Sequence, residues 1–204
     1  MHKDINQTVR ENYPRYQSIG DRVKTLVPDN IMLHEKQNHA RCQVGDAALT
    51  FDGNDERGRL CVVLNVEKTQ CFEFKIFCDD FMPEPCYRFE SDGSSHTNPA
   101  SANLTLRARR VHTPHFHKYD QDGRVIAYKT DVLASNEKAL VEDYQKAIRH
   151  FFDEERVQAE SGTQILPETL PLGVNDLEDP LEGKLYNQVS QIGKARFRGG
   201  GRRS

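Results

Sequence analysis

The first part of the chain carries apolar side chains at steps of three and four residues. This spacing places them on one face of a helix, and the positions are Ile5, Val9, Tyr13, Tyr16, Ile19, Val23 and Leu26. Pro14 interrupts the pattern, because proline removes an amide donor and clashes with the preceding turn. The pattern predicts one kinked helix or two short helices that end before Pro28, within an N-terminal helical segment over residues 1–30.

The spacing then changes to an alternation of apolar and polar residues, which is typical of strands with one buried face. Residues 70–77 alternate phenylalanine and isoleucine with glutamate and lysine. Residues 59–68 show a similar alternation, and the short link between the two runs predicts an antiparallel hairpin. Shorter runs at 47–51 and 86–90 stop at turn signals and are predicted to be strands as well.

A second hairpin and a helix follow. Residues 104–119 and 123–130 flank the turn DQDG, which predicts the last hairpin of the sheet. A helix is predicted over residues 136–158, with Ser135 or Asn136 as its N-cap. The stripe expected to be buried consists of Leu140, Tyr144, Ile148, Phe151 and Phe152.

From residue 159 onward no hydrophobic period is sustained. Residues 161–183 contain acids but no lysine or arginine, whereas residues 184–204 contain six basic residues and no acid. This composition predicts a largely disordered tail over 159–204, acidic and then basic. Its Arg-Gly end suits contacts with nucleic-acid phosphates, and the candidates are Arg196, Arg198, Arg202 and Arg203.

Together these patterns predict an α+β fold. We expect an antiparallel sheet of five to seven strands within a core of residues 31–158, preceded by the helical segment at 1–30. The C-terminal helix is expected to pack on one face of this sheet, and the tail to be peripheral.

The bulk composition narrows the function classes. A formal net charge of −3 and a pI near 6.2 give no overall reason to expect a nucleic-acid or membrane partner. The five cysteines are odd in number and form no CxxC pair, which favours reduced thiols. No apolar run approaches the ~20 residues of a membrane span, and no secretory hydrophobic segment is present. We therefore expect a cytoplasmic protein without a membrane partner.

The densest candidate chemistry lies in VHTPHFHKYD, residues 111–120. If this stretch is extended, His115 and His117 share one face, where two imidazoles can reach one ion or one substrate group. His96, in the loop SSHTNP, is a candidate third member. Three interpretations stay open: a metal site for Zn²⁺ or a similar ion at the three histidines, acid–base catalysis, or structural histidines on an edge strand.

No carboxylate follows the histidine pair at the spacing of a known metal motif. A cupin-like motif would need a glutamate a few residues after HxH, whereas here Asp120 and Asp122 lie in the turn, which tells against a cupin. The chain also lacks a phosphate-binding glycine loop and a GxSxG nucleophile motif. The pair Glu73 and Lys75 is most simply a solvated strand face.

Four short stretches carry a resemblance to a known family. HTNP at 96–99, TPHFHKY at 113–119, IAY at 126–128 and the helix that follows resemble an uncharacterised bacterial domain-of-unknown-function family with the motifs HTNP and PHxHxY. The resemblance extends over about residues 45–158, and the family is distantly similar to TumE-type proteins of toxin–antitoxin loci. It implies a small α+β fold that acts on RNA or inhibits a partner, with the motif residues His96, His115, His117, Tyr119 and Tyr128.

The chain departs from the family pattern in two places. The span between HTNP and PHFH is longer, and the tail at 159–204 is additional. The additional tail suggests an additional binding partner.

The leading hypothesis is a toxin-like or mobile-element protein that cleaves RNA without a cofactor. One neutral histidine would take the 2′-hydroxyl proton and a protonated histidine would serve the leaving oxygen. The residues predicted for these tasks are His115 and His117 as base and acid, His96 or Tyr119 as the orienting group, and Arg88 or Lys118 at the phosphate.

Two alternatives belong to other classes. The protein would be a non-enzymatic inhibitor or adaptor of a bacterial or phage defence complex if the 159–204 tail docks a cognate protein. It would bind Zn²⁺ if His96, His115 and His117 act as ligands.

Overall fold

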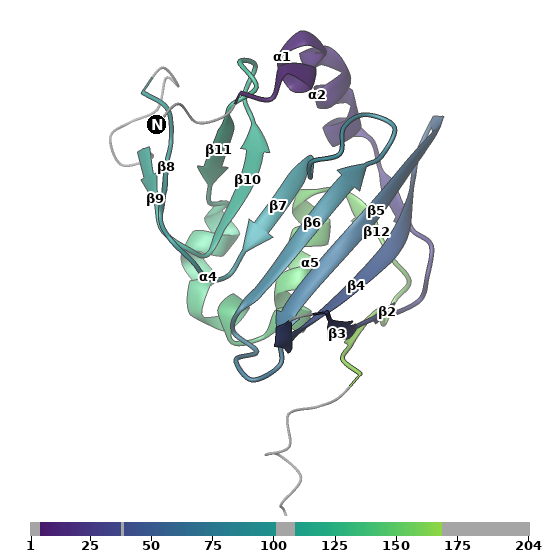
Figure 1. Cartoon of the computed structure of the whole chain (residues 1–204), viewed down its shortest axis with the longest axis vertical. Coiled ribbons are helices and arrows are strands. Elements are labelled where there is room, and N and C mark those ends of the chain that lie inside the picture. Colours follow the sequence, from purple (N-terminus) through teal and green to yellow (C-terminus); the bar gives the residue numbers. More distant parts are fainter. Residues whose placement is uncertain (1–4, 38, 101–108, 169–204) are drawn as a thin grey trace, which may run out of the picture. The chain divides into compact units, whose positions relative to one another are not determined.

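The computed structural model describes residues 5–37, 39–100 and 109–168. In these residues the chain forms a curled, largely antiparallel sheet accompanied by four helices (Figure 1). This confirms the mixed α and β content and the antiparallel sheet predicted from the sequence. The helices are α1 (Gln7–Glu11), α2 (Tyr13–Asp21), α4 (Asp131–Val141) and α5 (Tyr144–Glu154).

The main sheet has nine strands, more than the five to seven predicted. Its order is β11-β10-β7-β6-β5-β4-β1-β12, and β3 also pairs with β4; two further two-stranded sheets are β13-β2 and β8-β9. The extra strands are only two or three residues long, which is too short to show an alternation in the sequence. The strands are β1 (Lys24–Leu26), β2 (Ile31–Met32), β3 (His34–Lys36), β4 (His39–Phe51), β5 (Asn54–Asn65), β6 (Phe72–Cys78), β7 (Tyr87–Glu90), β8 (His96–Thr97), β9 (Arg110–Val111), β10 (His115–Tyr119), β11 (Val125–Tyr128), β12 (Val157–Gln158) and β13 (Ile165–Leu166).

The N-terminal segment forms two short helices, which is one of the two arrangements predicted. Pro14 lies in the first turn of α2, where its missing amide hydrogen costs no helical bond. The prediction that the helical segment continues to Leu26 is wrong, because Lys24–Leu26 forms β1 between β4 and β12. Hydrogen bonds to two neighbouring strands override the local periodicity here.

The middle of the sheet follows the predicted hairpin. Strands β5 and β6 are antiparallel, with Leu64 opposite Phe72. Phe74 of β6 and Phe89 of β7 are opposite one another and buried on the apolar face. The neighbouring pair, Lys75 and Arg88, lies on the other face because successive side chains alternate. This other face is called the charged face below.

The single helix predicted over 136–158 is wrong, because two helices occupy this part of the chain. Thr130 caps α4 and Asp143 caps α5, each through a side-chain oxygen that accepts a hydrogen bond from a first-turn amide. Asn136, a predicted cap, lies inside α4 with a non-helical backbone (φ −131°, ψ 23°). None of the helices in the described ranges is long and apolar enough to cross a bilayer.

The buried stripe predicted for this region is largely present, divided between α4 and α5. Leu140, Ile148, Phe151 and Phe152 are buried, and Tyr144 is half-buried. The ring of Phe151 lies 5.6 Å from that of Phe74 in β6 and 6.2 Å from that of Phe116 in β10.

Part of the predicted tail is ordered. Ile165–Leu166 forms β13, which pairs in parallel with β2, and Ile165 is 1% exposed. The folded part therefore extends beyond residue 158, and it does so through a two-residue strand that has no sequence period. Residues 169–204, with the basic candidates Arg196, Arg198, Arg202 and Arg203, lie outside the described residues.

Candidate metal centre

Strand β10 carries the histidine pair and lies inside the main sheet, between β7 and β11. Because side chains alternate along a strand, Phe116 joins the apolar core while His115 and His117 lie on the charged face. The register places Glu90 of β7 directly opposite His115, and Arg88 opposite His117. The two histidines are thus not the half-exposed pair of an edge strand.

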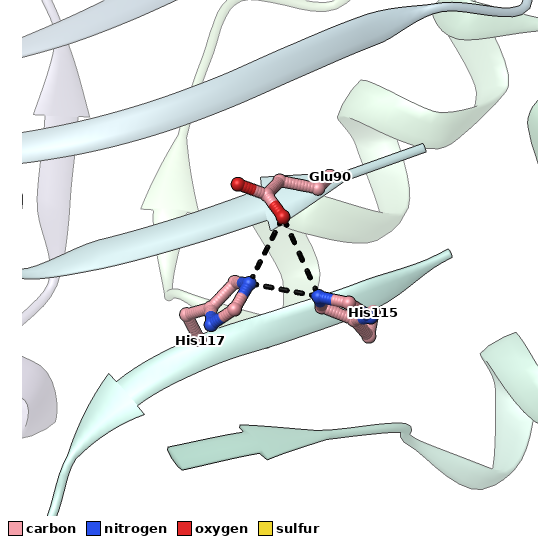
Figure 2. A group of neighbouring side chains, drawn as sticks. All are labelled: Glu90, His115 and His117. Carbon is pink, nitrogen blue, oxygen red and sulfur yellow. Dashed lines mark hydrogen bonds and ion pairs between the residues drawn. The ribbon is translucent and has the colours of Figure 1, made fainter. Parts of the chain in front are cut away.

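The Glu90 carboxylate and the two imidazoles point toward one another (Figure 2). Nε2 of His115 lies 2.8 Å from Nε2 of His117. Oε2 of Glu90 lies 3.1 Å from Nε2 of His117 and 3.4 Å from Nε2 of His115. Three atoms that can each donate an electron pair therefore form one small triangle.

Hydrogen bonds satisfy this triangle only in part. Each Nε2 offers either one proton or one lone pair in the plane of its ring. If both nitrogens carry protons, the protons face each other across 2.8 Å; if only one does, a lone pair is left facing another lone pair. A cation at the centre satisfies all three atoms at once. Ligands about 2.0–2.1 Å from a tetrahedral Zn²⁺ lie about 3.3 Å from each other, close to the separations found here.

Burial favours the neutral form of His117, and the neutral form is the one that metals require. His115 is fully buried and His117 is 5% exposed. Burial lowers the pKa of His117, although its hydrogen bond with Glu90 acts in the opposite direction. In the described part of the chain, neither ring has a hydrogen-bond partner at Nδ1. A neutral histidine is the form that coordinates a metal ion.

Arg88 fixes the orientation of the Glu90 carboxylate. Its Nε lies 3.2 Å from Oε1 of Glu90, while Oε2 faces the imidazoles. Burial by itself would raise the pKa of Glu90. Hydrogen bonds with His115 and His117 and the charge of Arg88 outweigh burial and hold this pKa well below its usual value. The carboxylate is therefore charged and presents one oxygen to the centre.

His96, the predicted third histidine, lies beside the pair. Its ring centre is 5.2 Å from that of His117 and 6.4 Å from that of His115. Its Nε2 lies 3.2 Å from the carbonyl oxygen of Val125 in β11, so this atom does not belong to the triangle. His96 forms a wall of the site. The third position of the triangle, which the sequence analysis assigned to His96, is occupied by Glu90.

The other predicted site residues are placed differently. Tyr119 packs against α2, where its amide donates to the hydroxyl of Tyr16 at 3.0 Å. The amino group of Lys118 lies over the ring of Tyr128, 4.5 Å from its centre. Arg88 is close to the histidines, but its nearest partner is a carboxylate. The structure thus gathers the three histidines and Arg88, and leaves Tyr119 and Lys118 outside the triangle.

Glu90 is the functional candidate that the sequence analysis missed. It precedes the histidines on another strand, and the turn-forming SDGSS follows it directly. The only available signal was its place at the end of a predicted strand. Glu73 was an equally plausible carboxylate for the site, since it lies opposite Glu90 on β6.

Comparisons of the chain with protein-family models, with curated proteins and with solved structures found no match. The resemblance to the HTNP and PHxHxY family therefore stays a prediction.

Proposed function

We propose that Glu90, His115 and His117 bind one divalent transition-metal ion and that this ion is the reactive centre of an enzyme. The observation that carries the proposal is the convergence of Oε2 and two Nε2 atoms within 3.4 Å of one another. Two imidazoles and one carboxylate are a ligand set of catalytic zinc and non-haem iron sites, which keep a coordination position open. A bound Zn²⁺ would polarise a substrate oxygen and lower the pKa of a coordinated water.

The fold supports this proposal by separating the site from the core. In our proposal α5 covers the apolar face of the sheet through the contacts of Phe151 with Phe74 and Phe116. The ligands occupy the opposite face on two neighbouring strands, β7 and β10, which both have a strand on either side. Ligands on paired strands of a sheet are more rigidly held than ligands on loops, which suits a preorganised metal centre.

The same geometry argues against metal-free RNA cleavage by this pair. A base and an acid that act on the 2′-hydroxyl and on the leaving oxygen must lie on opposite sides of the phosphate, and nitrogens 2.8 Å apart leave no room for it. RNA as a substrate, and a protein partner for the 159–204 tail, stay predictions.

Metal analysis of the purified protein tests the proposal. Protein dialysed against Zn²⁺, Mn²⁺ or Co²⁺, or against Fe²⁺ without oxygen, should retain about one ion per chain of at least one metal, and Glu90→Gln and His117→Ala should lose most of it. His34→Ala is the matched control, because the His34 side chain is 69% exposed. Circular dichroism and thermal unfolding establish that each variant is folded. A folded wild type that retains no ion, or folded ligand variants that bind as well as the control, would overturn the proposal.

A further inference from the structure

A hollow of about 220 Å³ lies directly beside His117. Its lining includes Arg88 of β7, Tyr119 of β10, Val125 of β11 and Pro85 from the segment before β7. The hollow is smaller than the ~300–1,000 Å³ typical of sites for drug-sized ligands, so a ligand enclosed by it must be small. His117 belongs both to this wall and to the metal centre, and Arg88 connects the two because it also pairs with the ligand Glu90.

Arg88 supplies the polar end of the hollow. Its ion pairs with Glu90 and Glu73 both involve Nε, and its side chain is 31% exposed. Among the described residues, no hydrogen bond occupies its two terminal amino groups. A guanidinium presents these groups as a planar fork that matches a carboxylate.

The remaining lining selects for an apolar body. Pro85, Val125 and the ring of Tyr119 are largely apolar surfaces. Glu84 also lines the hollow, and its carboxylate accepts a hydrogen bond from Asn6. Lys118 also lines the hollow, but side chains alternate along β10 and its amino group lies over the ring of Tyr128 instead. An anionic group would be repelled by Glu84 and attracted by Arg88, so the charged end of a ligand faces Arg88.

We infer that this hollow is the substrate site and that it binds a small organic carboxylate. The carboxylate contacts the terminal amino groups of Arg88, the aliphatic part packs against Pro85 and Val125, and the molecule lies against the metal ion beside His117. This inference rests on the proposed metal centre, because the bound carboxylate would react at the metal ion. The distinguishing feature is that one arginine holds a ligand of the metal and recognises the substrate.

The test uses the full chain loaded with Co²⁺ and titrated with straight-chain carboxylates from acetate to hexanoate by calorimetry. The matched probes are the corresponding neutral amides. At least one carboxylate should bind ten-fold or more tightly than its amide, and Val125→Trp, which fills the hollow but replaces no metal ligand, should abolish this binding while it retains Co²⁺. Val132→Trp on α4 is the control, because Val132 is 54% exposed.

The outcomes separate the two proposals. A folded chain that takes up no metal contradicts the metal centre itself. If Co²⁺ is bound but no carboxylate is preferred over its amide, or if Val125→Trp binds the carboxylate as well as the wild type, the substrate inference is wrong and the metal centre stands. Arg88→Met should weaken carboxylate binding at least ten-fold even at saturating Co²⁺. Unchanged binding would show that Arg88 does not recognise the carboxylate.

Discussion

Asn98 pairs through its side chain with both backbone groups of Ala127. Its Nδ2 donates to the carbonyl oxygen at 2.8 Å, and its Oδ1 accepts from the amide at 2.7 Å. Ala127 lies on β11 directly opposite His117. The HTN segment thus lies along the outer edge of β11, with His96 at Val125 and Asn98 at Ala127, and this contact brings His96 to the histidine pair.

Replacing Asn98 by alanine should therefore loosen this edge. The change leaves the amide and the carbonyl of Ala127 without their partner, which should lower the free energy of unfolding by about 1–3 kcal/mol. Denaturant unfolding measures the loss, and hydrogen exchange at the Ala127 amide should accelerate. Asn136→Ala is the control, since Asn136 is exposed. Equal effects of the two changes would show that the Asn98 contact does not hold the segment.

Arg88 should determine metal affinity through Glu90. Outer residues that orient metal ligands typically contribute 10–100-fold to affinity, so Arg88→Met should weaken metal binding by about this factor. Arg88→Lys should restore part of it, because it keeps the charge but not the geometry. Competition with a chromogenic chelator measures the affinity. Arg57→Met, which alters an exposed arginine paired with Asp80, should leave the affinity unchanged; a similar loss in both variants would indicate an unspecific effect of charge.

The stability contributed by Glu90 should depend on pH in a defined direction. Burial raises its pKa, but the hydrogen bonds with His115 and His117 and the charge of Arg88 lower it further, so the folded pKa lies below the unfolded one. The contribution is therefore fully present above the unfolded pKa of about 4.3 and disappears as the pH falls through the folded pKa. With a chelator present, Glu90→Gln should be less stable than the wild type by about 1–3 kcal/mol at pH 7.

Urea unfolding at pH 7, 5, 4 and 3 checks this prediction. The stability difference between the wild type and Glu90→Gln should be constant from pH 7 to 5 and shrink below the unfolded pKa. A difference that grows with acidity would contradict the direction assigned to the pKa of Glu90.

Lys24 should stabilise the fold through the ends of two helices. The amino group of this fully buried residue donates to the carbonyl oxygens of Gly20 and Arg22 at the end of α2 and of Glu155 at the end of α5. Burial lowers the pKa of Lys24 to about 8. Lys24→Met should cost more than about 2 kcal/mol, because three carbonyl groups lose a donor.

Thermal or denaturant unfolding measures this loss. Lys138→Met is a suitable comparison, since the Lys138 side chain is 86% exposed, and it should change the free energy of unfolding by less than about 0.5 kcal/mol. If the two variants unfold alike, the contacts of Lys24 do not connect the helices in the way described.

The sequence alone determined features that depend on neighbouring residues. The alternation in residues 70–77 predicted a strand with an apolar and a charged face, and Pro14 predicted a break in the first helical segment. The spacing of His115 and His117 placed both imidazoles on one face of a strand, which the structure confirms. Each of these results follows from the period of a single element.

Tertiary structure decided which partner each element has. The third member of the triangle is Glu90 because the register of β7 against β10 places it opposite His115; a shift by one residue would turn its side chain to the other face. Lys24–Leu26 and Ile165–Leu166 are strands only because distant segments supply their hydrogen bonds. Strand register minimises the free energy of the whole sheet, so a local period can predict the histidine pair but cannot identify the carboxylate that completes it.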